Sequence, residues 1–289
     1  MAWPVDGRDR GVPDRGADAM SADDFRNRFV ETVVHTAMTL SGGFAFPDEL
    51  DEVQGRLYHG TYLKHFSFFA WRFPSWLQAI SSQCPYQDVR SSIIEDCVDE
   101  EVGDTDADGR CHVDVLYDEA EACGISREEI AATEPTPIVL ACVHALENFS
   151  RTLGWQTGFA ALAGLEIIQS EPAVKLRNQI MAERLTPEEI ARGQSGRDPQ
   201  VLSQRLGIPP EQLQFAALHA YKDQFHGGGE LALLVKYGTT REVQESMLWG
   251  AKSGVEIYGV MRSEIDRLAR ASVGLPPRER RPVGAGARP

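Results

Sequence analysis

The sequence predicts an all-α protein, and two observations carry that prediction. Apolar residues recur at close to 3.6 positions along most of the chain, which is the spacing of one face of an α-helix. Strand signals are scarce, because no segment sustains an alternation of β-branched and polar residues, and no Asn-Gly or Asp-Gly pair joins two such runs. Several helices in one chain, with no internal repeat, favour a single helical domain.

The ends of the chain differ in composition from its centre. Residues 1–21 are rich in Gly, Asp and Arg and have no hydrophobic period. Residues 275–289 are rich in Pro, Gly and Arg. Such segments bury too little apolar surface to offset the conformational entropy lost on ordering. We expect a disordered leader over 1–21, one domain over 22–274 and a disordered tail over 275–289.

In the first half of the chain, starting and stopping signals mark the ends of the expected helices. Pro74 predicts a bend within a long aromatic-rich stretch. Gly124 predicts the end of one helix, and Ser126 with Glu129 has the pattern of a capping box that starts the next. The expected helices are 23–40, 48–84 with its bend, 88–102, 111–123 and a short helix after Ser126.

Starting and stopping signals also mark the expected helices in the second half of the chain. Gly154 predicts a break within a long apolar stretch. Pro and Gly bound the segments that follow, and Thr186 precedes Pro-Glu-Glu in the manner of a helix cap. The expected helices are 137–169 in one or two pieces, 172–184, a segment starting at Thr186, 201–206, 210–237 and 240–271.

Composition and charge exclude several classes of function. The 43 acidic and 29 basic residues give a net charge of −14, which argues against nucleic-acid binding. No apolar run approaches the roughly 20 residues of a membrane-spanning helix, and the N-terminus lacks a secretory pattern. The five cysteines contain no C-x-x-C pair, so neither a disulfide framework nor a zinc site of usual spacing is indicated. We expect a cytoplasmic protein.

The most informative motif is His219-x-x-x-Asp223-x-x-His226. On an α-helix these three residues lie on one face within two turns. Two imidazoles and one carboxylate form a ligand set that suits iron, and also manganese or zinc. In the alternative, the histidines only hydrogen-bond to backbone or to Asp223. Three ligand-type residues in register favour a metal site.

A second group of ligand-type residues follows in the acidic segment around Glu101. If Ile94 and Val98 face the core, the helical period places Glu101 on the inward stripe and turns Glu100 aside. Glu101 closes one expected helix and His112 opens the next, so a short loop would bring both to one site. Carboxylates at a helix C-terminus are disfavoured by the helix dipole, which a bound cation would relieve.

A third candidate is Glu166, a lone carboxylate in an apolar stretch. Burying it without a partner is costly, so a metal, a salt bridge or an exposed position remain open. The aspartates of Asp104-x-Asp106-x-Asp108-Gly109 resemble the start of a calcium loop, but the twelfth position is Val115 instead of Glu. We interpret them as a solvated connection.

Two other features lie near or outside these groups. His35 is isolated and has no second feature of a haem ligand. Three glycines follow His226, and each helical glycine costs about 1 kcal/mol relative to alanine. The turn after the third motif residue is therefore expected to be locally weak.

The order of these motifs resembles that of the haem-oxygenase-like diiron oxidases and oxygenases. The resemblance spans roughly residues 55–240 and is most specific at the His219 motif. It rests on the following segments, in order: Trp71-Arg-Phe-Pro74-Ser-Trp-Leu, Asp99-Glu-Glu101-x-Gly103, His112-x-x-x-Leu116, Gly164-Leu-Glu166 with Pro172, and His219-x-x-x-Asp223-x-x-His226.

The resemblance implies a haem-oxygenase-like bundle of about seven core helices that holds two non-haem Fe(II) ions and uses O2 as co-substrate. It implies oxidation of a small metabolite of specialised metabolism, often derived from an amino acid. Two departures concern the surroundings of the site: residues 71–83 offer no further carboxylate, and 186–210 resemble an insertion. The ligands that it implies are Glu101, His112, Glu166, His219, Asp223 and His226.

Two other functions fit the same fold. The bundle would work without metal in an oxidase resembling pyrroloquinoline quinone synthase, or in a hydrolase of the thiaminase-II type. Alternatively, the chain is a non-catalytic helical partner protein. A small-molecule substrate and a homodimer are the partners we expect, with no nucleic acid and no membrane.

Overall fold

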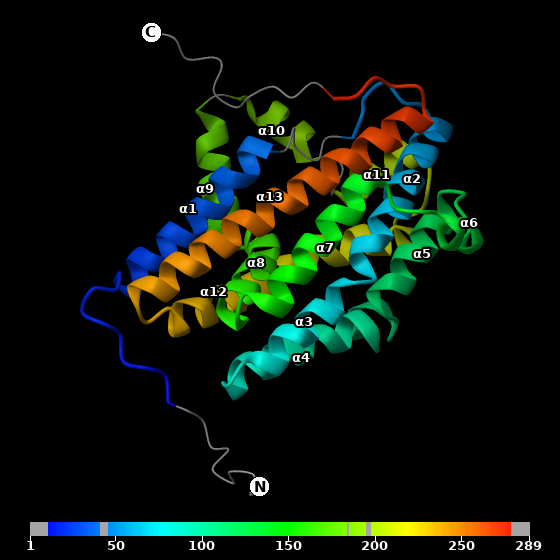
Figure 1. Ribbon diagram of the computed structural model, residues 1–289. Coiled ribbons are helices and arrows are strands. Elements are labelled where there is room, and N and C mark those ends of the chain that lie inside the picture. Colours follow the sequence, from blue (N-terminus) through cyan, green and yellow to red (C-terminus); the bar gives the residue numbers. More distant parts are fainter. Residues whose placement is uncertain (1–10, 41–45, 184, 195–197, 279–289) are drawn as a thin grey trace, which may run out of the picture.

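The computed structural model describes residues 11–40, 46–183, 185–194 and 198–278, and within these ranges all side chains except those of 40, 191–194, 220, 221 and 223–226. The predicted all-α class is confirmed: the described residues form α-helices, short 3₁₀ helices and no β-strand. The α-helices (Figure 1) are α1 (Ala22–Leu40), α2 (Glu52–Ala70), α3 (Phe73–Gln83), α4 (Gln87–Glu101), α5 (His112–Ala122), α6 (Arg127–Ala132), α7 (Pro137–Thr152), α8 (Trp155–Ile167), α9 (Glu171–Ala182), α10 (Pro187–Gln194), α11 (Pro199–Leu206), α12 (Gln214–Tyr237) and α13 (Arg241–Ser272).

The helix boundaries follow the capping chemistry of the sequence. Asp51 forms a capping box with Gln54 at the start of α2, and the Thr240 side chain accepts a hydrogen bond from a backbone N–H of α13. Gly154 separates α7 from α8 with a φ of 78°, a left-handed conformation that favours glycine. We expected the aromatic-rich stretch to form one helix bent at Pro74, but it forms two separate helices, α2 and α3. The chain leaves the helix at Trp71, and Pro74 lies in the first turn of α3, where proline is tolerated.

The helices pack around α8, which is apolar on nearly all sides. Every residue from Trp155 to Ile167 is buried except Gln156 and Glu166. Helices α7, α12 and α13 surround α8, while α1 lies beside α13, and α3 and α4 pair at one edge of the bundle (Figure 1). A helix that is hydrophobic all round belongs at the centre of a protein, so the composition of α8 fixes its central place.

Small residues let α13 approach α8 closely. Gly250 and Gly254 of α13 face the backbone of α8 at Thr157 and Ala161, and Gly164 of α8 faces α13. A Cβ atom built on Gly254 would lie only 2.1 Å from the carbonyl oxygen of Ala161. The spacing of these two helices therefore depends on the absence of side chains along their contact.

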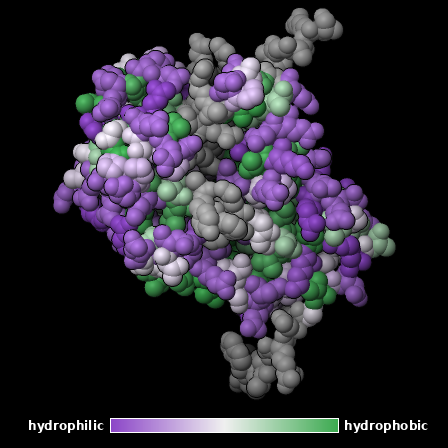
Figure 2. Space-filling view, turned by 180° about the vertical axis from the view of Figure 1, so that it is seen from behind, coloured by the Kyte–Doolittle hydropathy of each residue, from purple (hydrophilic) through white to green (hydrophobic). Residues whose placement is uncertain are grey.

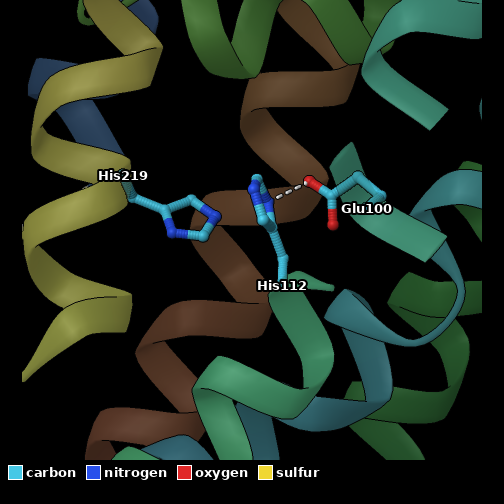
Figure 3. A group of neighbouring side chains, drawn as sticks. All are labelled: Glu100, His112 and His219. Carbon is cyan, nitrogen blue, oxygen red and sulfur yellow. Dashed lines mark hydrogen bonds and ion pairs between the residues drawn. The ribbon is translucent and has the colours of Figure 1, made fainter. Parts of the chain in front are cut away.

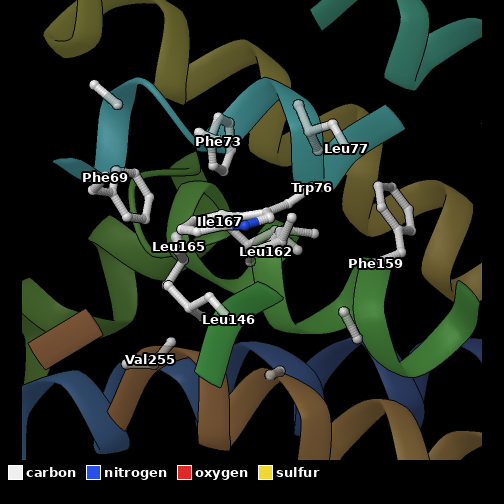
Figure 4. Close-up of a cluster of buried hydrophobic side chains, with 14 of the residues drawn as sticks. Phe69, Phe73, Trp76, Leu77, Leu146, Phe159, Leu162, Leu165, Ile167 and Val255 are labelled. Atoms are coloured by element: carbon white, nitrogen blue, oxygen red, sulfur yellow. The ribbon is translucent and has the colours of Figure 1, made fainter. Parts of the chain in front are cut away.

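One end of the core is built around Trp76 of α3, which is fully buried (Figure 4). Aromatic rings from the same part of the chain surround it, and the Phe69 ring meets the indole edge to face at 5.5 Å. Leu162 and Leu165 of α8 lie nearby and complete this apolar cluster (Figure 4). The cluster joins α3 to α8. Because α4 follows α3 directly, the cluster also places α4 at the edge of the bundle.

The described parts of the two end segments, for which we expected disorder, form hydrogen bonds with the bundle. The Arg15 guanidinium donates to the carbonyl oxygens of Val235 and Gly238, at the end of α12. At the other end, Arg270 donates to the carbonyl oxygen of Pro276 at 2.6 Å. Residues 1–10 and 279–289, the remainder of the expected leader and tail, lie outside the described residues.

The surface is mainly hydrophilic on the face shown in Figure 2, where hydrophobic residues appear in small scattered groups. In the described part of the chain, no helix has both the length and the apolar composition that crossing a membrane requires.

The close contact between α8 and α13 leads to a stability prediction. Gly254→Ala should lower the free energy of unfolding by about 1–3 kcal/mol, because the new methyl group forces two helix backbones apart. Urea unfolding followed by circular dichroism measures the change. Val260→Ala, on the exposed side of the same helix, should change stability by no more than about 0.5 kcal/mol. Equal effects of the two substitutions would contradict the prediction.

Candidate metal centre

Three side chains from distant parts of the sequence meet between α4, α5 and α12. Glu100 lies at the end of α4, His112 is the first residue of α5, and His219 lies in the second turn of α12. Each offers one ligand atom, and these atoms all lie within 4.8 Å of one another. In Figure 3 the imidazole of His219 points toward that of His112, which is hydrogen-bonded to Glu100.

His112 is held between two carboxylates. Its Nδ1 lies 2.9 Å from Oε1 of Glu100, and its Nε2 lies 2.9 Å from Oδ2 of Asp104. Burial favours the neutral ring, but the hydrogen bonds and charges of the two carboxylates outweigh it and raise the pKa of His112 to about 9. Without a metal, His112 is therefore an imidazolium at neutral pH, with an N–H directed at each carboxylate.

His219 has the opposite character. Its Nδ1 donates to the carbonyl oxygen of Phe215 at 2.9 Å, which leaves Nε2 as the nitrogen with a free lone pair. Burial lowers its pKa, and the nearby charge of His112 lowers it further. The centroids of the two imidazole rings are 5.1 Å apart, and the ring planes meet at 64°. A neutral imidazole whose orientation is fixed by a backbone hydrogen bond is suited to bind a metal.

The structure corrects the expected inward stripe of α4. Its buried residues are Val89, Ile93 and Cys97, and Glu100 continues that stripe toward His112. Ile94 and Val98 are 54% and 42% exposed, so the condition on which Glu101 was placed on the inward stripe is not met, and Glu101 is exposed with them. The buried residues of α4 follow the helical period, but their stripe lies one residue before the one assumed. The sequence alone does not show which apolar residues of a helix are buried.

The aspartate-rich loop between α4 and α5 also departs from expectation. Asp104 is fully buried instead of solvated. Its backbone pairs with Arg110 in an isolated antiparallel bridge, so the loop is a tight structure that returns the chain to His112. Asp108 is exposed and occupies the left-handed region with a φ of 57°. The loop therefore forms the wall of the His112 site.

Lys222 of α12 binds this loop from the opposite side. Its Nζ lies 2.9 Å from Asp99, 2.9 Å from Asp104 and 3.2 Å from Asp106. Burial alone would lower the pKa of Lys222, but the three carboxylates raise it, so the ammonium group stays charged. The sequence gives only a weak signal for this role: Lys222 is one of just five lysines in the chain.

A buried carboxylate also anchors the start of α12. Glu119 of α5 accepts a hydrogen bond from the backbone N–H of Ala216 at 3.1 Å and lies 2.7 Å from Nε2 of His59. The first N–H groups of a helix have no partner within it, and a carboxylate there also meets the positive end of the helix dipole. Glu119 thereby fixes α12 beside α5, one turn before His219. No sequence pattern pointed to Glu119 or His59.

Glu166 reaches the same region from α8. Its charge raises the pKa of His219, although burial and His112 have the larger effect. Helices α8 and α12 touch here, since a Cβ on Gly227 would lie 2.9 Å from the carbonyl oxygen of Glu166. The first of the three glycines after His226 thus permits close packing of the helices, and α12 continues through all three.

The expected ligands therefore stand as follows. The structure brings His112 and His219 together, places Glu166 within electrostatic reach, and puts Glu100 where Glu101 was expected. The side chains of Asp223 and His226 lie outside the described residues. One carboxylate and two imidazoles form the ligand set that non-haem Fe(II) sites use, so Glu100, His112 and His219 fit such an ion.

Comparisons with known proteins identify a family and a relative. A family model described as iron-containing redox enzyme matches residues 61–259. The 4-aminobenzoate synthase of Chlamydia muridarum (strain MoPn / Nigg) is 31% identical over 122 residues. That alignment covers 42% of this chain and 45% of the synthase, so the chain spans less than half the length of this relative.

A solved structure shares the fold. A TenA homologue from Pseudomonas syringae pv. tomato strain DC3000 has a TM-score of 0.54 and 12% sequence identity, covering 88% of this chain and 98% of that chain. At this identity the likeness concerns the arrangement of helices alone.

The raised pKa of His112 predicts how the stability of the metal-free protein depends on pH. The folded pKa of about 9 lies above the ordinary value of 6.5, so the protonated ring stabilises the fold fully below about pH 6.5. This contribution, on the order of 3 kcal/mol at most, is lost as the pH rises through about 9. Urea unfolding of chelator-treated protein across this range measures it. The stability of the His112→Gln variant should not show this loss. An identical dependence of stability on pH in the variant and the unaltered protein would contradict the prediction.

Two neighbouring glycines offer a matched test of the contact between α8 and α12. Gly227→Ala should lower the free energy of unfolding by about 1–3 kcal/mol, because its methyl group would meet the backbone of Glu166 and Ile167. Gly228 has open space around it, so Gly228→Ala should raise stability by up to about 1 kcal/mol. Thermal and urea unfolding compare the two variants. Stabilisation by both would show that the helices do not approach as described.

Proposed function

The chain belongs to the family of iron-containing redox enzymes, whose model matches residues 61–259, and from this premise we propose that it is an O2-dependent non-haem diiron oxidase or oxygenase. The family and the all-α fold agree with the haem-oxygenase-like resemblance found in the sequence. The observation that carries the proposal is the convergence of Glu100, His112 and His219 within 4.8 Å. The number of irons and the use of O2 are the parts that we propose.

Two sets of residues would hold the metal. Glu100, His112 and His219 would bind one Fe(II). Glu166 of α8 lies within electrostatic reach of His219 and, with Asp223 and His226 of the α12 motif, would complete a second position. Ferrous ions held there would supply the electrons with which O2 is reduced.

The chain itself would exclude water and hold the ligands. Phe215 packs against the His219 ring with a centroid distance of 4.2 Å, and Phe66 lies 6.1 Å from Phe215. These rings give the site an apolar border on the side of α2. Displacing water there strengthens the electrostatic interactions of the ligands and protects reactive species from hydrolysis.

We propose that the substrate is a small metabolite. The similarity to a 4-aminobenzoate synthase supports a small amine- or carboxylate-bearing compound, such as one derived from an amino acid. Hydroxylation, N-oxygenation, desaturation and oxidative carbon–carbon cleavage all agree with such a centre. We also propose a cytoplasmic protein that binds neither nucleic acid nor membrane and forms a homodimer.

Iron loading tests the proposal and separates the two neighbouring glutamates. Anaerobic reconstitution with Fe(II) should give about two irons per chain, and exposure to air should then consume O2. Glu100→Gln should lower the iron content by about one ion per chain, because it removes a charged ligand. Glu101→Gln changes the same charge one residue away, at an exposed position, and should bind iron like the unaltered protein.

Other outcomes point to other functions. A protein that binds no iron under these conditions would contradict the proposal and favour a metal-independent oxidase or hydrolase on the same fold. Loss of iron in Glu101→Gln, with full iron in Glu100→Gln, would restore the ligand implied by the sequence. An Asp223→Ala variant that keeps every activity and binding property would favour a non-catalytic partner protein.

A further inference from the structure

Resting on the proposed function, we infer that Asp104 is a positioning residue, which holds Nε2 of His112 so that Nδ1 faces the metal. Asp104 belongs to the loop whose aspartates resemble the start of a calcium site. The structure gives its carboxylate a different task.

The Asp104 carboxylate is fixed in place by three partners. Its Oδ2 lies 2.9 Å from Nε2 of His112. Its Oδ1 accepts the backbone N–H of Asp106 at 2.8 Å and lies 2.9 Å from Nζ of Lys222. The residue is fully buried, so water does not compete for these bonds. Burial disfavours its charge, but the hydrogen bonds outweigh this and lower its pKa, which keeps it ionised.

The two nitrogens of His112 have unequal surroundings. Nδ1 faces Glu100, which also belongs to the group of ligand atoms that includes His219. Nε2 faces Asp104, which does not belong to that group. When a metal ion takes the proton's place between His112 and Glu100, the Nε2–H bond to Asp104 can persist unchanged. The ring then keeps its orientation, and the carboxylate increases the basicity of the nitrogen that binds the metal.

Lys222 links this hydrogen bond to the helix that carries the other ligands. It lies on α12, three residues after His219 and one before Asp223. Its ammonium group reaches Asp104 and also Asp99 of α4. It therefore offsets the repulsion among the carboxylates and ties α12 to the loop that orients His112. A chain of charged hydrogen bonds thus joins the His112 ring to the helix that carries His219.

The same contacts argue against a separate calcium site in this loop. The first aspartate of the motif directs both oxygens at donors of the protein, and one of these donors is a lysine. A cation in the loop would have to displace that ammonium group.

The inference is tested with Co(II), which is stable in air and gives optical and paramagnetic NMR signals. Asp104→Ala should weaken Co(II) binding by about 10- to 100-fold, the usual effect of removing a carboxylate that holds a histidine ligand. Asp108→Ala removes the same charge from an exposed position of the same loop and should change affinity by no more than about twofold. Asp104→Asn retains the shape of the side chain, so its Co(II) affinity should lie between those of the two alanine variants. Competition with a chelator of known affinity gives the dissociation constants.

A second measurement reports on the hydrogen bond itself. In the Co(II) protein, the Nε2–H proton of His112 should give a hyperfine-shifted resonance that exchanges slowly with solvent. That resonance should disappear or exchange rapidly in Asp104→Asn, and persist in Asp108→Ala. A purely structural role for Asp104 would leave it unchanged in every variant that folds.

His112→Ala separates this inference from the proposed metal centre. If His112→Ala weakens Co(II) binding but Asp104→Ala does not, the positioning role is wrong and the metal centre stands. If His112→Ala leaves binding unchanged, the metal centre fails and the positioning role fails with it. Should Asp104→Ala not fold, the Asp104→Asn affinity and the slowly exchanging resonance decide the question.

Discussion

The arrangement around His112 depends on satisfying both nitrogens of a buried imidazole. A buried polar group that lacks partners costs free energy, and here two carboxylates meet the ring from opposite sides. Each carboxylate would be costly to bury alone, so the three groups are stable only as a set. Glu100 and Asp104 lie four residues apart, on α4 and the loop that follows. The loop must therefore turn back tightly for both carboxylates to reach the His112 ring.

The rest of the bundle keeps the histidines at a fixed distance. Glu119 binds the start of α12 to α5, and Lys222 binds α12 to the loop of Asp104. Gly227 allows α12 to contact α8 next to Glu166, and glycines of α13 hold α8 from the other side. Interiors are closely packed, so a displacement of α8 would be transmitted to α12 and to His219. The spacing of the two histidines thus depends on several helix contacts.

The fold alone does not determine the chemistry. A TenA homologue shares the helical arrangement at 12% identity, and one architecture often carries unrelated activities. What connects this chain to redox chemistry is its membership of an iron-containing family together with the grouping of a carboxylate and two imidazoles. The apolar side of Phe215 and the charged side of Asp104 give this group an asymmetric environment.

The sequence by itself determined the all-α class, most helix boundaries and the placing of His112 and His219 among the ligand candidates. These features depend on local periodicity, capping residues and spacing along one helix, all of which are written in short segments. Tertiary structure alone decided that Glu100, and not Glu101, faces His112, since the phase of α4 depends on what packs against it. It also decided that Asp104 is buried and that Lys222 and Glu119 hold α12. Those contacts join residues about 100 positions apart, and no local pattern records which charged groups a fold will bring together.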